Sequence, residues 1–193
     1  MSTLRALLTI TWAAWIWLEL VAVLAPTVMD RLRGRARARD AGSVVLLLAC
    51  VGAGFVAAVR LARLDPGTLP GPPGALLAAG LALMWAGLAL RAWSIQHLGG
   101  LFRAVVVIQP DHRLVTTGPY RYLRHPSYSG ALLAALGFGL ALGHWTSLLA
   151  LLASWGAGLA YRIRVEEAAL RATFGPAYDE YCARTRRLVP LLY

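Results

Sequence analysis

The sequence predicts an all-α, polytopic membrane protein with about five transmembrane helices, followed by C-terminal helices in the cytosol. Its composition is the first reason: 59% of the 193 residues are hydrophobic and 15% are charged, with a mean hydropathy of +0.60. The second reason is that the apolar residues gather into runs close to the length, about 20 residues, that a helix needs to cross a bilayer. The third is a polar stretch, residues 112–130, that separates two of these runs. This profile is typical of an integral membrane protein and not of a soluble domain.

The apolar runs predict where the helices cross. The predicted spans are residues 7–29, 43–62, 74–95, 126–143 and 146–162. A carboxylate within the first run, Glu19, is costly in lipid and is therefore a candidate functional group, unless it pairs with an arginine of another helix or is protonated. Between the last two runs, Gly143-His144 leaves room only for a tight turn, so these runs form a helical hairpin.

Small residues predict close contacts between the helices. Gly52 and Gly54 lie in the second run, and Gly80 and Gly87 lie in the third. Arg91, at the end of the third run, is expected to mark the membrane interface.

The distribution of charge orients the chain. Loop 30–40, segment 96–127 and the C-terminal tail are basic, whereas loops 63–73 and 143–145 are nearly neutral. The positive-inside rule then places the N-terminus outside and the C-terminus in the cytosol, at what we expect to be a bacterial inner membrane. Segments 96–125 and 162–193 flank the same hairpin on the cytosolic side and should be neighbours. No domain boundary is evident, so residues 1–193 are read as one domain.

The 19 basic residues, all arginines, outnumber nine acidic residues and give a net charge of +10. Because they lie beside apolar runs, the expected partners are anionic lipid headgroups and not nucleic acid. Cys50 and Cys182 form neither a metal-binding spacing nor an evident disulfide pair. The four histidines are scattered along the chain, so no metal site is expected. The sequence does not indicate the oligomeric state.

Residues 112–130 form the strongest candidate for a site. Gly118-Pro119 is a turn signal, and Arg124-His125-Pro126 predicts a helix start with proline at the first helical position. A helix N-terminus flanked by Arg121, Arg124 and His125 favours an anionic group. The alternative is a basic loop that only anchors helices at the headgroups.

The C-terminal segment adds a second polar group. A helix is expected over 162–173, ended by Phe174-Gly175-Pro176 and followed by a second helix over 178–187. Arg162 and Glu166 are four residues apart and share a helix face, which by itself is also compatible with a surface salt bridge.

Two motifs point to a known family. They read GPYRYLRHPSYSG and, after the hairpin, RIRVEEAALRATFGPAYDEY. In order and spacing they closely resemble the isoprenylcysteine carboxyl methyltransferase family, over residues 96–193. The resemblance implies an integral membrane enzyme that uses S-adenosyl-L-methionine, held in a cytosol-facing pocket between the first motif and the C-terminal helices.

The resemblance also implies roles for individual residues. The positions that match cofactor contacts are Gln109, His112, Arg113, Leu114, Val115, Tyr120, His125, Pro126, Ser127, Tyr128 and Glu166. Arg162 matches the residue placed near the substrate carboxylate, which makes it the catalytic candidate. These chemistries suit the cofactor, because tyrosine faces attract a sulfonium and an arginine holds a carboxylate at two points.

The methyl acceptor stays open at this point. The resemblance implies O-methylation of an isoprenylcysteine-like carboxylate on a lipophilic small molecule or a prenylated protein. A phenolic lipid is the alternative, and would need His125 or Glu166 as a base. A membrane reductase of the sterol-reductase type, which uses NADPH, carries a similar loop and is the second alternative. A membrane scaffold or transporter is the third.

Overall fold

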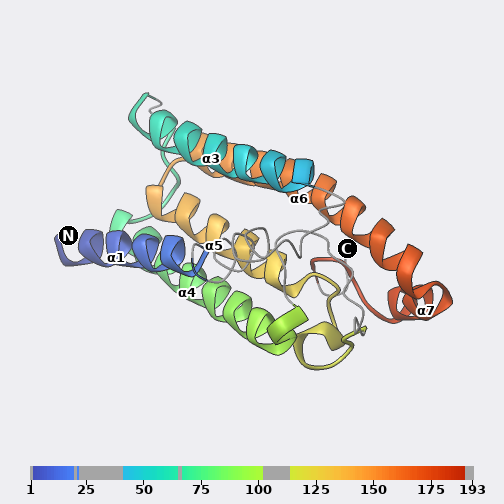
Figure 1. Cartoon of the computed structure of the whole chain (residues 1–193). Helices are drawn as coiled ribbons and strands as arrows, with labels where there is room; N and C mark the ends of the chain where they lie inside the picture. The colour runs from blue at the N-terminus through green and yellow to red at the C-terminus, as the bar shows by residue number, and fades with distance from the viewer. Residues whose placement is uncertain (1, 20, 22–40, 65–66, 102–113, 190–193) are drawn as a thin grey trace.

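The computed structural model of the chain describes residues 2–19, 21, 41–64, 67–101 and 114–189 (Figure 1). Its elements are α1 (Ser2–Glu19), α3 (Ala41–Leu64), α4 (Pro73–Leu98), the short 3-10 turns η2 (Gly99–Leu101) and η3 (Gly118–Arg121), α5 (Pro126–Leu142), α6 (Trp145–Phe174) and α7 (Pro176–Arg184). All regular elements within these ranges are helical, as predicted. The basic loop 30–40 lies outside the described residues.

Three of the described helices are long and apolar enough to cross a membrane: Gly42–Leu64, Pro73–Leu98 and Trp145–Phe174. Two shorter apolar helices, Ala6–Leu18 and Pro126–Leu142, accompany them. The protein is therefore an integral membrane protein with a polytopic helical fold. Crossing by the two shorter helices stays a prediction, and the second half of the predicted span 7–29 falls largely outside the described residues.

Helix α6 is longer than the span predicted at its start. The predicted span 146–162 and the predicted helix 162–173 form one continuous helix of 30 residues. At 1.5 Å per residue such a helix is about 45 Å long, whereas the hydrocarbon core of a bilayer is about 30 Å thick. The excess of about 15 Å corresponds to roughly ten residues, so the polar C-terminal third of the helix can extend beyond the apolar core and carry charged side chains there.

Helices α4 and α5 pack through paired glycines, as predicted for Gly80 and Gly87. A Cβ atom added at Gly80 would lie 2.5 Å from the Gly137 carbonyl oxygen, and one at Gly130 would lie 2.5 Å from the Gly87 oxygen. Since backbone atoms occupy the space of a side chain, only glycine permits this approach. Figure 1 shows the two helices side by side.

Helices α3 and α6 form a second antiparallel pair (Figure 1). A Cβ atom at Gly54 would lie 3.1 Å from the Ser154 Cβ atom, so the predicted contact at Gly54 is confirmed. The predicted close contact at Gly52 is not formed within the described part of the chain, where a Cβ atom at this position would meet nothing within 4 Å. Serine hydroxyls also join the pair, since Ser147 donates to the Ala58 carbonyl at 2.7 Å.

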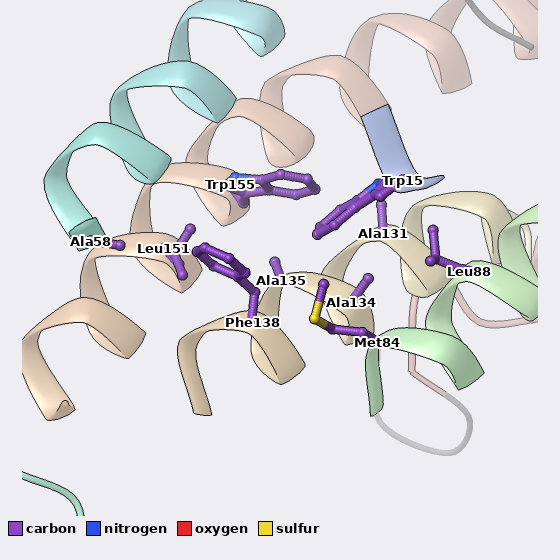
Figure 2. Close-up of a cluster of buried hydrophobic side chains, with 10 residues drawn as sticks. All are labelled: Trp15, Ala58, Met84, Leu88, Ala131, Ala134, Ala135, Phe138, Leu151 and Trp155. Atoms are coloured by element: carbon purple, nitrogen blue, oxygen red, sulfur yellow. The ribbon is translucent and has the colours of Figure 1, made fainter. Parts of the chain in front are cut away.

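Aromatic rings fill the space between the two helix pairs and α1. The Trp15 and Trp155 rings lie 5.3 Å apart between centroids, and Phe55 meets Phe138 edge-on at 5.1 Å. Figure 2 shows Trp15, Trp155 and Phe138 converging with small alanines of α5. Edge-on and tilted pairs are favourable ring geometries, so this cluster joins the two pairs into one bundle.

The loops gather at two opposite ends of the bundle. At one end the hairpin turn meets the loop before α4, where the Leu69 amide donates to the Gly143 carbonyl at 2.8 Å. Gly143 has φ +75°, a left-handed conformation that suits glycine. The other end carries η3, the start of α5 and α7 (Figure 1). His144 is therefore separated from the polar motifs.

Candidate functional site

The polar motifs meet at the second of these ends, as predicted from their position around the hairpin. Helix α5 begins at Pro126, with His125 as its N-cap residue. Proline suits the first helical position because its missing N–H has no partner within the helix. The start of α5 faces the polar half of α6, and this places His125 and Tyr128 opposite Glu166 and Glu167.

Arg162, Tyr128 and Glu166 form a connected chain of polar groups. The Tyr128 hydroxyl donates to Glu166 Oε2 at 2.9 Å, and Arg162 Nε donates to the Tyr128 hydroxyl oxygen at 3.3 Å. Arg162 Nε also lies 4.0 Å from Glu166 Oε2. Arg162 is 1% exposed, whereas the Glu166 side chain is 28% exposed. The phenol of Tyr128 thus joins a buried cation to a partly open carboxylate. Because Arg162 is buried, the pair of Arg162 and Glu166 is not an ordinary surface salt bridge.

His125 lies between the two neighbouring acids. Its ring stacks on the Tyr128 ring, with 5.6 Å between centroids and 17° between planes. Its Nδ1 atom is 4.0 Å from Glu166 Oε2, and its Nε2 atom is 3.4 Å from Glu167 Oε1. Because the residue is buried, these contacts fix the direction of both ring nitrogens.

Glu167 is the residue to which sequence reasoning assigned no role. It is buried, and its carboxylate binds Arg124 Nε at 2.9 Å and Arg187 Nη2 at 2.9 Å, in addition to His125. A buried carboxylate needs such partners, because desolvation is costly for a charge. The signal available in the sequence was the acid pair itself. Adjacent helical residues point in directions about 100° apart, so the two acids had to have different surroundings.

The chain after α7 forms a strap, residues 185–188, that lies along the loop before α5. The Arg124 amide donates to the Arg186 carbonyl at 2.7 Å, and the His125 amide donates to the Arg187 carbonyl at 3.0 Å. Arg124 Nη1 donates to the Thr185 carbonyl at 2.6 Å. The helix predicted over 178–187 therefore ends early, at Arg184, because the next residues hydrogen-bond to this loop instead.

Tyr120, in η3, and Ser127, in the first turn of α5, attach this part of the chain to α4. The Tyr120 hydroxyl donates to the Ser94 carbonyl at 3.3 Å, and Ser127 Oγ accepts from Arg91 Nη1 at 2.7 Å. Burial, and then the negative charge of Glu166, raises the pKa of the Tyr120 phenol, which keeps it protonated as a donor. Arg91 is buried against α5. Its position at the membrane interface stays a prediction.

The other predicted contacts are less defined. Pro126 is fully buried at the start of α5. Leu114 and Val115 lie in irregular chain before η3 and are half-buried. Gln109, His112 and Arg113 lie outside the described residues, as does the side chain of Glu19. Of the predicted set, the structure brings His125, Tyr128, Arg162 and Glu166 into direct contact or ion-pair range.

Comparison with known proteins gives a consistent result. Residues 80–172 match the model of the isoprenylcysteine carboxyl methyltransferase family. A protein-S-isoprenylcysteine O-methyltransferase of Schizosaccharomyces pombe is 37% identical over 115 residues, which cover 58% of this chain and 48% of that protein. Protein-S-isoprenylcysteine O-methyltransferase B of Arabidopsis thaliana is 36% identical, with 58% of each chain covered. This chain thus spans about half the length of the curated relatives it matches.

A solved structure is also similar. It is that of the eukaryotic intramembrane Ras methyltransferase, an isoprenylcysteine carboxyl methyltransferase. The TM-score is 0.60 at 26% sequence identity, and the match covers 75% of this chain and 52% of the other. The likeness therefore extends to the arrangement of the helices as well as to the motifs.

We expect the two acids to differ sharply when each is neutralised. Glu167→Gln leaves Arg124 and His125 without their buried carboxylate and should lower the free energy of unfolding by about 3 kcal/mol. Glu166→Gln changes a partly exposed group and should cost about 1 kcal/mol or less. Thermal unfolding of the two variants in the same detergent measures the difference. Equal melting midpoints for both variants would contradict a structural role specific to Glu167.

Proposed function

We propose that this chain, whose residues 80–172 match the model of the isoprenylcysteine carboxyl methyltransferase family, is an S-adenosyl-L-methionine-dependent methyltransferase of the membrane. Its acceptor is a lipophilic carboxylate of the isoprenylcysteine type, on a small molecule or a prenylated protein. The observation that carries the proposal is the chain of contacts from Arg162 through Tyr128 to Glu166. It unites a buried cation suited to a carboxylate with an open acid suited to the cofactor.

The residues present fit the cofactor. The carboxylate of Glu166 is partly open and can accept hydrogen bonds from an ammonium group or from ribose hydroxyls. Tyr128 contributes an aromatic ring beside it, and such rings attract a sulfonium through cation–π interaction. When bound, S-adenosyl-L-methionine supplies a methyl group made electrophilic by its sulfonium. Glu166, Tyr128 and His125 are the described residues that would hold it.

The acceptor needs orientation more than activation. A carboxylate is already ionised and nucleophilic near neutral pH, so this reading requires no general base. The Arg162 guanidinium can bind it at two points and keep one oxygen directed at the methyl group. Arg162 is 1% exposed, so a carboxylate must shift the present neighbours of the guanidinium to reach it, and the contact then forms away from water. The rate enhancement then comes from orientation and exclusion of water.

The same arrangement supports a proposal for the location of the site. The polar motifs lie at one end of the bundle, beyond its apolar helices. With the positive-inside rule, this end faces the cytosol. We propose the bacterial inner membrane as the location, so that a lipophilic acceptor reaches Arg162 from the bilayer while the polar cofactor arrives from the cytosol.

The first prediction of this proposal concerns Glu166. Glu166→Ala should weaken the binding of S-adenosylhomocysteine by roughly 10- to 150-fold, because a hydrogen bond to a charged group is lost. Isothermal titration calorimetry on detergent-purified protein measures this. Glu180→Ala is the matched control, because Glu180 forms an exposed i, i+4 pair with Arg184 and should leave the affinity unchanged. Equal affinity in wild type and Glu166→Ala would remove Glu166 from the cofactor site.

The second prediction concerns the acceptor. Arg162→Lys should keep the affinity for S-adenosylhomocysteine within a few-fold but lower methyl transfer to N-acetyl-S-farnesylcysteine by at least about tenfold. Lysine keeps the charge but lacks the planar two-point contact, and misplacement is costly where orientation dominates. A single-turnover assay measures the transfer, with Arg171→Lys, on the same helix but exposed, as control. Full activity of Arg162→Lys would contradict the two-point contact with a carboxylate. An inactive His125→Ala variant that still binds S-adenosylhomocysteine like wild type would then favour a phenolic acceptor that needs a base.

A further inference from the structure

Helix α3 contributes a polar side chain to the site although it lies outside the residues that match the family. Ser43, in the first turn of α3, accepts a hydrogen bond from Arg162 Nη1 at 2.6 Å. Both side chains are buried, Ser43 completely and Arg162 with 1% exposed. Hydrogen bonds to a charged group are stronger than neutral ones, and burial strengthens them further. This contact therefore acts on the orientation of the guanidinium.

The Ser43 contact differs from the other serine contacts between α3 and α6. Ser147 and Ser154, both on α6, donate to the backbone carbonyls of Ala58 and Cys50 on α3. Such bonds join two helices without affecting a functional side chain. Ser43 instead accepts from Arg162, which lies beside Tyr128 and Glu166. Its contact therefore links helix packing to the site.

We propose that Ser43 is a positioning residue for the methyl acceptor, which it influences by holding the plane of the Arg162 guanidinium. This inference rests on the proposed function. Tyr128 and Glu166 contact the guanidinium from its Nε side, and Ser43 contacts it at Nη1. Contacts at two separate nitrogens fix both the position and the plane of the group. A long arginine side chain otherwise has much rotamer freedom, about 2 kcal/mol.

The plane matters because a carboxylate binds arginine with two parallel hydrogen bonds. If the guanidinium rotates, the acceptor carboxylate still lies beside a positive charge, but its oxygens are no longer directed at the methyl group. Ser43 thereby affects catalysis on the carboxylate without contacting the cofactor-binding acid. The first turn of α3 becomes part of the acceptor site, although no residue of α3 lies within the family match.

The test compares two serines at the same helix interface. Ser43→Ala should lower kcat/KM for N-acetyl-S-farnesylcysteine by about tenfold, while the affinity for S-adenosylhomocysteine stays within about twofold of wild type. Ser147→Ala is the matched control, since it removes a buried bond between α3 and α6 far from Arg162, and should leave kcat/KM unchanged. Ser43→Thr keeps the hydroxyl and should restore most of the activity.

Two results of this comparison would overturn the inference. One is an equal loss of kcat/KM in Ser43→Ala and Ser147→Ala, which would show that only helix packing had changed. The other is a Ser43→Thr variant with the melting midpoint of wild type and the activity of Ser43→Ala.

If the wild-type chain does not methylate N-acetyl-S-farnesylcysteine, the proposed acceptor is refuted, but the contact between Ser43 and Arg162 is not. A second measurement tests the contact in that case. Ser43→Ala, Arg162→Met and the double variant are compared by thermal unfolding. If Ser43 holds Arg162, Ser43→Ala lowers the melting midpoint in the wild-type background but scarcely changes it in Arg162→Met. Additive shifts would show that the two residues are independent and would overturn the inference.

Discussion

The site depends on one constraint, which is that a guanidinium buried in a bundle of apolar helices must be surrounded by polar partners. Arg162 is almost completely buried, and partners come to it from three different helices: Ser43 from α3, Tyr128 from α5 and Glu166 from α6 itself. An unpaired charge at this depth would be strongly unfavourable. The packing of these three helices and the geometry of the site are therefore determined together.

The two adjacent acids of α6, Glu166 and Glu167, have different roles at this end of the bundle. Glu167 is buried and binds Arg124, Arg187 and His125, so it joins the loop before α5 to the C-terminal strap. Glu166 is partly open and hydrogen-bonds to Tyr128. Glu167 thus stabilises the contact between the loop and the strap, while Glu166 remains available to a ligand. His125 contacts both acids, so its orientation in the site depends on the contact between the loop and the strap.

Local features were predictable from the sequence because they depend on neighbouring residues alone. Pro126 at the start of α5 and the turn at Gly143 follow from backbone geometry. The contact between Arg162 and Glu166 follows from helical spacing. Features that depend on distant partners were not predictable in this way. Burial of Arg91 requires Ser127 across the α4–α5 contact, and the early end of α7 requires a loop to receive the strap.

The most direct test of the proposed chemistry is the nature of the bond that receives the methyl group. Purified protein is incubated with S-adenosyl-L-methionine labelled in its methyl group, with N-acetyl-S-farnesylcysteine and, separately, with a phenolic lipid of similar length. The proposed reaction predicts label on the farnesylcysteine that alkali releases as methanol, because the product is a methyl ester. Label only on the phenolic lipid, stable to alkali as an ether would be, would contradict the carboxylate assignment, and no transfer to either would contradict the proposed activity.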